Sequence, residues 1–400
     1  MRLHDDHPTT RTPIPGRVES GPDLAGIAPE SVYIPGIGPP TVPLTFERDG
    51  VTCGVVPVAL ATGAYGEINP EIFLAAFYLH AHYRLGAESD GFPDAVPFNE
   101  PRLRDHILTR YLGQQTIAVD LGPGLISAAR SQLARGAPVL VQVERSMLEQ
   151  CASGYHGRPG RHLLLLKGFR RGLLDVFVVQ DNQHVEPVAN GRFLGTDPPR
   201  LVDVLDEPMV TLRAMAHSRT VALKSLLGEM YVEGFYPAIL VESAHDGFLR
   251  RARSTPGYHL EDVSVLALER VASGQWPDAT AALAGLREAM WPVSADVEAV
   301  VLRKVAFTGR GGDPRAALAY VSSQRAFVAA TAVLAERAGV DQGRVAEFRK
   351  AGVAVAQAWT RHTILRAVTT AQTGATPADQ PDEEILQLER RLIDQLHQLH

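Results

Sequence analysis

The sequence is poor in cysteine, in long apolar runs and in clustered positive charge. Two cysteines among 400 residues cannot form a disulfide framework, so we expect a cytoplasmic protein in a reducing environment. No stretch is apolar for long enough to cross a bilayer, and we therefore expect no membrane span. The formal net charge is −6, from 39 lysines and arginines against 45 acidic residues, without a long basic run. This balance argues against nucleic acid as a partner.

The chain divides by composition into four segments. Its first residues, MRLHDDHPTTRTPIPGRVE, lack an apolar core, so we expect no secretory signal peptide. The N-terminal part is rich in proline and glycine and is predicted to be an arm lying on the surface or partly disordered. The predicted segments are an N-terminal arm (1–44), a catalytic domain (45–215), a helical domain (216–372), and a linker with a C-terminal helix (373–400).

The stretch from residue 136 to residue 181 contains the first candidate functional residues. It reads as an apolar strand, a glycine-rich loop and a hairpin of two further strands. If the hairpin turn is centred on Arg171-Gly172, His162 lies directly opposite Asp181, with Cβ atoms about 4.5–5.5 Å apart. A carboxylate at that distance can accept the imidazole N–H and orient a general base. A register slip of one residue would separate the two side chains.

Cys53 is the candidate nucleophile. It precedes an apolar segment, Val55 to Ala61, which is predicted to be a buried helix. Pro57 is tolerated only in the first helical turn, so the helix should begin around Cys53-Gly54. Backbone amides at a helix start favour a thiolate. Cysteine before a buried helix, followed by histidine and aspartate on later strands, is the order found in papain-like enzymes.

Other interpretations of these residues remain open. Cysteine and histidine are often inert core residues, and Asp181 could close a turn. Cys151 is a rival nucleophile, closer to His162 in sequence but without a following helix. Cys151, His156 and His162 lack a fourth ligand at a zinc spacing, and no phosphate-binding loop is present. We therefore expect no metal and no cofactor.

The order of predicted elements indicates an α+β fold. Asn69 and Pro70 should begin a helix that runs to about Arg84, and two more helices, ending near Leu112 and spanning 125–134, precede the strands. With the order of the candidate residues, this favours a papain-like cysteine-protease fold followed by an all-helical domain. A last strand is expected at 209–215, and then helices near 217–232, 237–252, 260–274, 277–289, 294–307, 314–338 and 341–370.

The C-terminal helix, EEILQLERRLIDQLHQLH, carries one apolar stripe. Its members, spaced by three or four residues, are Ile385, Leu388, Leu392, Leu396 and Leu399. The stripe is predicted to pack on its own domain, and the alternative is a homodimer contact.

Several short motifs together resemble the N-terminal domain of butirosin biosynthesis protein H. They are GAPVLVQVERSMLEQ, Tyr155-His156, RHLLLLKGF and VVQD, within residues 46–215, and the helical remainder is similar to the C-terminal region of that family. The residues that fall on the family pattern are Cys53 at the nucleophile position, Glu144, Leu148, Tyr155, and His162 and Asp181 at the base and acid positions. Two positions depart from it, because Thr52 replaces a histidine and Glu47 replaces the oxyanion-binding glutamine of papain-like enzymes.

The resemblance implies a cysteine acyltransferase of natural-product biosynthesis. Such an enzyme takes an acyl group from an acyl or peptidyl carrier protein and passes it to an amine of a small-molecule acceptor. Gln114 or Gln115 could replace the missing oxyanion donor. The alternatives are a thioesterase or other cysteine hydrolase on the same triad, and a catalytically inactive scaffold that binds a carrier protein.

Overall fold

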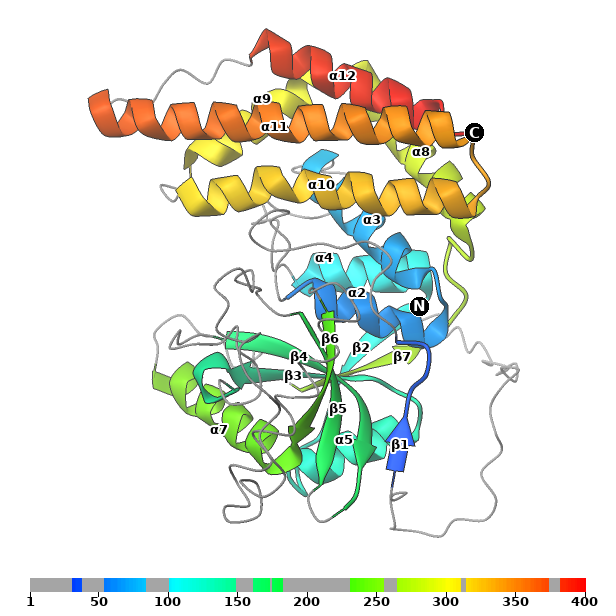
Figure 1. Ribbon diagram of the computed structural model, residues 1–400, viewed down its shortest axis with the longest axis vertical. Helices are drawn as coiled ribbons and strands as arrows, with labels where there is room; N and C mark the ends of the chain where they lie inside the picture. Colours follow the sequence, from blue (N-terminus) through cyan, green and yellow to red (C-terminus); the bar gives the residue numbers. More distant parts are fainter. Residues whose placement is uncertain are drawn as a thin grey trace, which may run out of the picture.

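The computed structural model describes residues 31–37, 54–83, 101–148, 161–172, 175–182, 231–254, 265–310, 314–373 and 382–400. In these residues an antiparallel β-sheet forms one end of the molecule and a bundle of long helices forms the other (Figure 1). The fold is α+β with a helical C-terminal region, which confirms the fold class at this level.

All strand pairs in the described chain are antiparallel. The order is β2-β7-β3-β4-β5-β6, and β1 pairs with β4. The strands are β1 (Ser31–Tyr33), β2 (Gln114–Ala118), β3 (Val139–Glu144), β4 (Arg161–Arg170), β5 (Val176–Asn182), β6 (Tyr231–Pro237) and β7 (Leu266–Arg270). The apolar run in the middle of β4 is buried on both sides, because helices cover both faces of the sheet.

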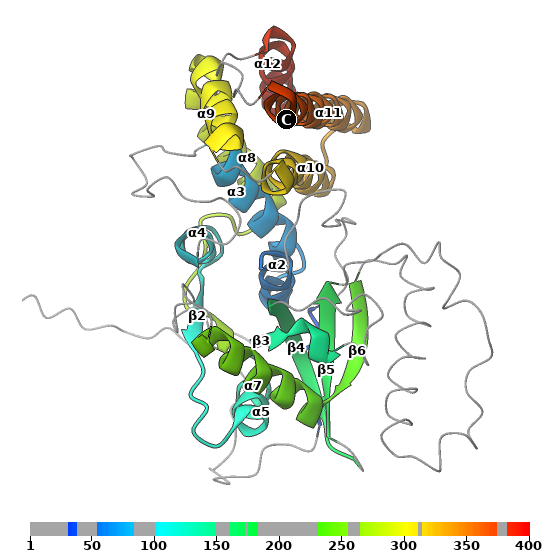
Figure 2. The ribbon, with the colours of Figure 1, turned by 90° about the vertical axis from the view of Figure 1, so that its left-hand side faces the viewer.

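Helices α2 (Val56–Thr62) and α7 (Ala238–Ser254) cover opposite faces of the sheet (Figure 2). The short helix η1 (Gly63–Tyr65) continues α2, and α5 (Leu125–Ala134) packs beside α7. Every residue of α2 is buried, as the apolar sequence predicts, and Pro57 lies in its first turn. The helix begins two or three residues later than the predicted start at Cys53-Gly54.

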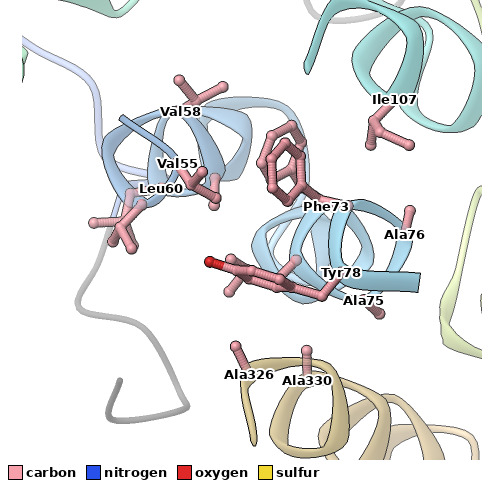
Figure 3. Packing of buried hydrophobic residues seen from close by; sticks show 14 of the residues in the cluster. Val55, Val58, Leu60, Phe73, Ala75, Ala76, Tyr78, Ile107, Ala326 and Ala330 are labelled. Atoms are coloured by element: carbon pink, nitrogen blue, oxygen red, sulfur yellow. The ribbon is translucent and has the colours of Figure 1, made fainter. Parts of the chain in front are cut away.

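Helix α3 (Asn69–Tyr83) connects the sheet to the bundle. It is buried on all sides, since it packs against α2, against α4 (Pro101–Ile107) and its extension η3 (Leu108–Leu112), and against three bundle helices. Figure 3 shows Ala326 and Ala330 of the bundle facing α3, where small side chains allow close approach. The predicted start at Asn69-Pro70 is confirmed, and one continuous cluster of buried apolar side chains runs from the sheet into the bundle.

The bundle consists of the helices that follow β7. They are α8 (Ala279–Ala295), α9 (Val297–Arg310), α10 (Pro314–Arg337), α11 (Gln342–Thr373) and α12 (Glu383–His397). These helices confirm the predictions for 277–289, 294–307, 314–338 and 341–370 to within a few residues, except that α8 extends through Pro292. The apolar stripe of α12 packs inside the bundle, with Ile385, Leu392 and Leu396 each 1% exposed. The predicted internal packing is confirmed, so this stripe is not available as a dimer contact.

After residue 182 the structure differs from the predicted elements in two places. The helix predicted over 260–274 is wrong, because residues 266–270 form β7 between β2 and β3. The helix predicted over 217–232 is wrong at its end, where β6 begins at Tyr231. The strand predicted at 209–215 lies outside the described residues. The sheet thus draws on residues from both sides of the boundary predicted at residue 215.

Two strands of the sheet, β1 and β2, lie in segments where no strand was predicted. Residues 31–37 were expected in an arm on the surface, but β1 pairs with β4, and Ile34 and Ile37 are buried. Strand β2 was not predicted. Its residues follow a helix directly, and the strand exists because it pairs along its whole length with β7.

Candidate functional site

His162 is the second residue of β4, a strand in the middle of the sheet. Its Cα partner in β3 is Val143, and the side chain is only 1% exposed. The β3 strand and the long apolar run of β4 fix this position, because both strands are buried and pair without irregularity from residue 161 to residue 166. His162 is therefore a buried polar side chain at the end of an apolar strand.

The face on which His162 lies follows from its neighbours. Glu144, the last residue of β3, accepts a hydrogen bond from Arg251 of α7, with Nη1 and Oε2 2.6 Å apart. Successive residues of a strand point to opposite faces, so Val143 points away from α7. Directly paired residues share a face, and His162 therefore lies on the side of the sheet that α2 covers (Figure 2).

Helix α2 is anchored at its C-terminal end. The backbones of Gly36 and Gly63 approach so closely that a side chain at either glycine would clash with the other. The adjacent Ile34 donates its N–H to the Lys167 carbonyl (2.8 Å), and Tyr65 donates its hydroxyl to the Leu268 carbonyl (2.6 Å). The end of α2 is thus held near Lys167 and β7, five residues along β4 from His162.

Cys53 lies outside the described residues. The first described residue after it is Gly54, and Val55 precedes α2 with a helical backbone and no side-chain cap. Cys53 is therefore separated by two residues from a buried helix that packs on the same face as His162. The rival nucleophile Cys151, His156 and the two departing positions, Glu47 and Thr52, also lie outside the described part.

The predicted hairpin register of β4 and β5 is wrong. The observed Cα partners are Leu165 with Gln180 and Arg170 with Val176, and Lys167 is an extra residue in β4. The connection between the strands is longer than the predicted two-residue turn, which offsets the pairing by three residues at Arg170, and the bulge at Lys167 reduces the offset to two at Leu165. Continuing this register places Leu164, and not His162, opposite Asp181.

The shifted register nevertheless leaves positions 162 and 181 on the same face of the sheet. Near this end the register differs from the prediction by two residues, and side-chain direction repeats every two residues. Position 181 therefore belongs to the same face of the sheet as His162 and is its diagonal neighbour, about 7–8 Å away between Cα atoms. The Cα partner that the structure gives Asp181 on its other side is Val232 of β6.

Gln114 and Gln115 lie too far from His162 to complete the same site. Both are in β2, and β7 and β3 separate this strand from β4. Three strand spacings amount to about 14 Å. Neither glutamine is therefore placed to donate to an oxyanion beside His162.

The two histidines of α3 have separate structural partners. His80 Nε2 lies 3.0 Å from the Tyr111 hydroxyl, and His82 Nε2 lies 2.9 Å from the Ser323 hydroxyl. The two imidazoles therefore contact different neighbours, on different sides of the helix. No group of three or more histidine, cysteine or acidic side chains in the described ranges is arranged to hold a metal ion.

A cluster of buried polar residues in the bundle, here called the Glu389 cluster, was not predicted from the sequence. Glu389 is completely buried and accepts hydrogen bonds from four side chains on four other helices. The donors, with their shortest distances to the carboxylate, are Tyr83 (3.0 Å), Lys304 (2.6 Å), Gln324 (3.2 Å) and Trp359 (2.8 Å). The sequence feature that could have revealed this cluster is a glutamate within the apolar stripe of α12, four residues after Ile385 and three before Leu392.

No protein-family model, curated protein or solved structure matches this chain. None of the described helices combines the length and the apolar character that a bilayer crossing requires.

Proposed function

We propose that the protein is a cysteine acyltransferase of natural-product biosynthesis, with Cys53 as nucleophile, His162 as general base and Asp181 as the residue that orients His162. The observation that carries the proposal is the position of His162. It is buried on a central strand, on the face covered by the helix that begins just after Cys53. The motifs that resemble butirosin biosynthesis protein H assign the same three residues, and with them a papain-like arrangement of the sheet.

The first half of the reaction loads the enzyme. His162 takes the proton of the Cys53 thiol, and the thiolate attacks the carbonyl of an acyl thioester on a carrier protein. The tetrahedral intermediate collapses, the carbon–sulfur bond to the carrier breaks, and the carrier thiol leaves with the proton from His162. The acyl group then remains on Cys53 as a thioester.

The second half transfers the acyl group to the acceptor. An amine of the small-molecule acceptor attacks the Cys53 thioester while His162 accepts its proton, and the Cys53 thiol leaves. Asp181 would hold the imidazole in the tautomer that both steps need. Water as acceptor in place of the amine makes the same site a thioesterase, and only the acceptor distinguishes the two activities.

The test is intact-protein mass spectrometry after incubation with acyl-loaded carrier proteins. We expect a mass increase equal to the acyl group on the wild type, no increase on Cys53→Ala, and an unchanged increase on the matched control Cys151→Ala. His162→Ala should load slowly at neutral pH and recover partly at high pH, where the thiol ionises without a base. Labelling that persists in Cys53→Ala and is lost in Cys151→Ala would refute the assignment of the nucleophile.

The acyl-loaded enzyme also distinguishes a transferase from a hydrolase and from an inactive scaffold. Acyl groups released only when an amine is added identify a transferase, and release into water identifies a hydrolase. A scaffold that only binds carrier protein would show complex formation without any mass increase. Its Cys53 should also resist iodoacetamide at about pH 6, whereas a thiolate stabilised by His162 should be alkylated rapidly.

A further inference from the structure

A cavity of about 420 Å³ lies where the sheet meets the bundle, away from His162. Its walls come from the connection between η1 and α3, the connection between β7 and α8, and the last residue of α10. The side chains that define its chemistry are those of Tyr65, Glu67, Arg270, Trp276 and Arg337. His162 is not among the described residues that line it.

Arg270 brings positive charge to this cavity. It is the last residue of β7, its side chain is exposed, and its Nε lies 3.5 Å from the Ala272 carbonyl, which is at the limit of a hydrogen bond. No carboxylate among the described residues forms an ion pair with it. A guanidinium offers several N–H donors in a planar fork, a geometry that suits phosphate and carboxylate groups.

Arg337 provides a second guanidinium to the lining of the cavity. Its Nη2 lies 2.7 Å from Oε1 of Glu67, and the two side chains are 51% and 82% exposed. An ion pair so open to water contributes little and exchanges easily. A bound anion can therefore take the place of Glu67 on Arg337.

Two aromatic side chains, Tyr65 and Trp276, provide neutral parts of the lining. Burial, together with the nearby charge of Glu269, raises the pKa of Tyr65 to about 12, so its hydroxyl stays protonated and adds no negative charge. That hydroxyl is held by the Leu268 carbonyl at 2.6 Å. Trp276 is buried and packs against Tyr111 with ring centroids 4.1 Å apart, which fixes a flat apolar surface beside the two arginines.

We propose that this cavity binds a small organic anion, in which a phosphate or carboxylate is attached to a flat apolar group. Arg270 and Arg337 bind the anionic group, and Trp276 contacts the apolar group. A mostly preformed cavity with a few converging polar groups is the usual form of a small-molecule site. The site is separate from the Cys53 chemistry and is independent of it.

Calorimetric titration of the full chain with phenyl phosphate, benzoate and benzyl alcohol tests this proposal. We expect saturable binding of phenyl phosphate, of benzoate or of both, and no saturable binding of the neutral benzyl alcohol. Binding of phenyl phosphate alone identifies a phosphate ligand, and binding of benzoate alone identifies a carboxylate. Failure of both anions to bind, or equal binding of the alcohol, would overturn the proposal.

Three variants connect the binding to the cavity. Arg270→Gln should weaken anion binding about tenfold or more, because it removes charge-assisted hydrogen bonds. Glu67→Gln should strengthen binding, because it frees Arg337 and removes a competing carboxylate. The matched control Arg349→Gln, at an exposed arginine that pairs with Glu336 and does not line the cavity, should leave affinity unchanged. Unchanged affinity in both Arg270→Gln and Glu67→Gln, in proteins whose circular dichroism matches the wild type, would refute the site.

Discussion

The Glu389 cluster in the bundle and the sheet differ in how completely their buried polar groups are hydrogen-bonded. In the Glu389 cluster both carboxylate oxygens accept hydrogen bonds from side chains of the surrounding helices. Among the described residues of the sheet layer, several buried side-chain atoms have no hydrogen-bond partner, namely Oε1 of Gln142, Nε2 of Gln180, Nε2 of His245 and both amide atoms of Gln114. The bundle outside the cluster has such atoms as well, including Oγ1 of Thr331 and of Thr363. Satisfied buried networks rigidify a fold, whereas unsatisfied groups are costly and call for another explanation, such as a functional role. The Glu389 cluster, and not the bundle as a whole, is therefore the buried polar group from which we expect the largest contribution to stability.

The largest expected effect is on the bundle side of this comparison. Glu389→Ala leaves the Lys304 ammonium buried without its counter-charge, and Tyr83 and Trp359 lose their acceptor. Removing one partner of a buried ion pair typically costs about 3–5 kcal/mol in the free energy of unfolding. Urea denaturation followed by circular dichroism measures this loss, and a cost below about 1 kcal/mol would contradict the structural role.

Lys304 shows why the cluster works only as a unit. Burial lowers the pKa of its ammonium group, while the charge of Glu389 and the hydrogen bond to it oppose that shift. Burial and Glu389 also raise the pKa of Tyr83 well above its ordinary value, so its hydroxyl remains a donor. Glu389→Gln, which keeps the shape but removes the charge, should therefore destabilise less than Glu389→Ala.

The next prediction concerns the sheet. Asp181→Asn should leave the free energy of unfolding nearly unchanged and slow acyl transfer at neutral pH by about 10²-fold, since it disturbs the tautomer of His162. The comparable change in the serine triad costs about 10⁴-fold, and a thiol needs less help from its base. Single-turnover transfer rates measure the effect, with Asn182→Ala as the control at the neighbouring position, which alternates to the other face. Full activity of Asp181→Asn would remove Asp181 from the site.

Local signals predicted those elements that local chemistry controls. Pro57 located the first turn of α2, and Asn69 with Pro70 located the start of α3. The spacing of apolar residues identified the strands on which His162 and Asp181 lie. In each case the residues that determine the element are adjacent in the sequence, so tertiary contacts had little to add.

The elements that were not predicted correctly are determined by pairing between strands that lie far apart in the sequence. The segment LALER, residues 266–270, contains good helix formers, but pairing with β2 and β3 makes it a strand. The hairpin register failed at the turn, which is longer than two residues and offsets the pairing by three, and the bulge at Lys167 reduces the offset to two. The sequence feature that could have indicated the bulge is Gly168, because glycine within a strand often marks a bulge or a close backbone approach. A side chain at this position would meet the Val32 carbonyl.

The next prediction concerns the pH dependence of stability, to which the buried His82, beside the Glu389 cluster, should contribute. The Ser323 hydroxyl donates to the Tyr320 carbonyl at 2.7 Å, so His82 donates from Nε2 to Ser323, and its Nδ1 has no partner among the described residues. Burial, and secondarily Lys304, lowers the pKa of His82 well below 6.5. Below that pH the unfolded chain binds a proton that the folded protein does not bind.

The free energy of unfolding should therefore fall as pH drops below about 6.5, by up to about 1.4 kcal/mol per pH unit from this one group. His82→Phe should flatten that dependence, whatever its effect on stability at pH 8. Urea titrations at pH 5, 6, 7 and 8 measure the slopes. Partly exposed His362, whose pKa is also lowered by burial, serves as the control, and His362→Phe should change the slope less. Equal slopes for wild type and His82→Phe would show that His82 is not the titrating group.

The smallest effect is expected at Glu384, on the same helix as Glu389. Its Oε1 lies 2.8 Å from Nη2 of Arg361, but the two side chains are 58% and 64% exposed. Water screens both charges and competes for their hydrogen bonds, so an exposed pair of this kind contributes about 0–1 kcal/mol. A double-mutant cycle with Arg361→Ala and Glu384→Ala should give a coupling below about 0.5 kcal/mol that shrinks further in 0.5 M salt, where the screening length is about 4 Å. A coupling close to the cost of Glu389→Ala would mean that burial does not set the value of the carboxylates on α12, and the contrast between the satisfied cluster and the rest of the protein would lose its physical basis.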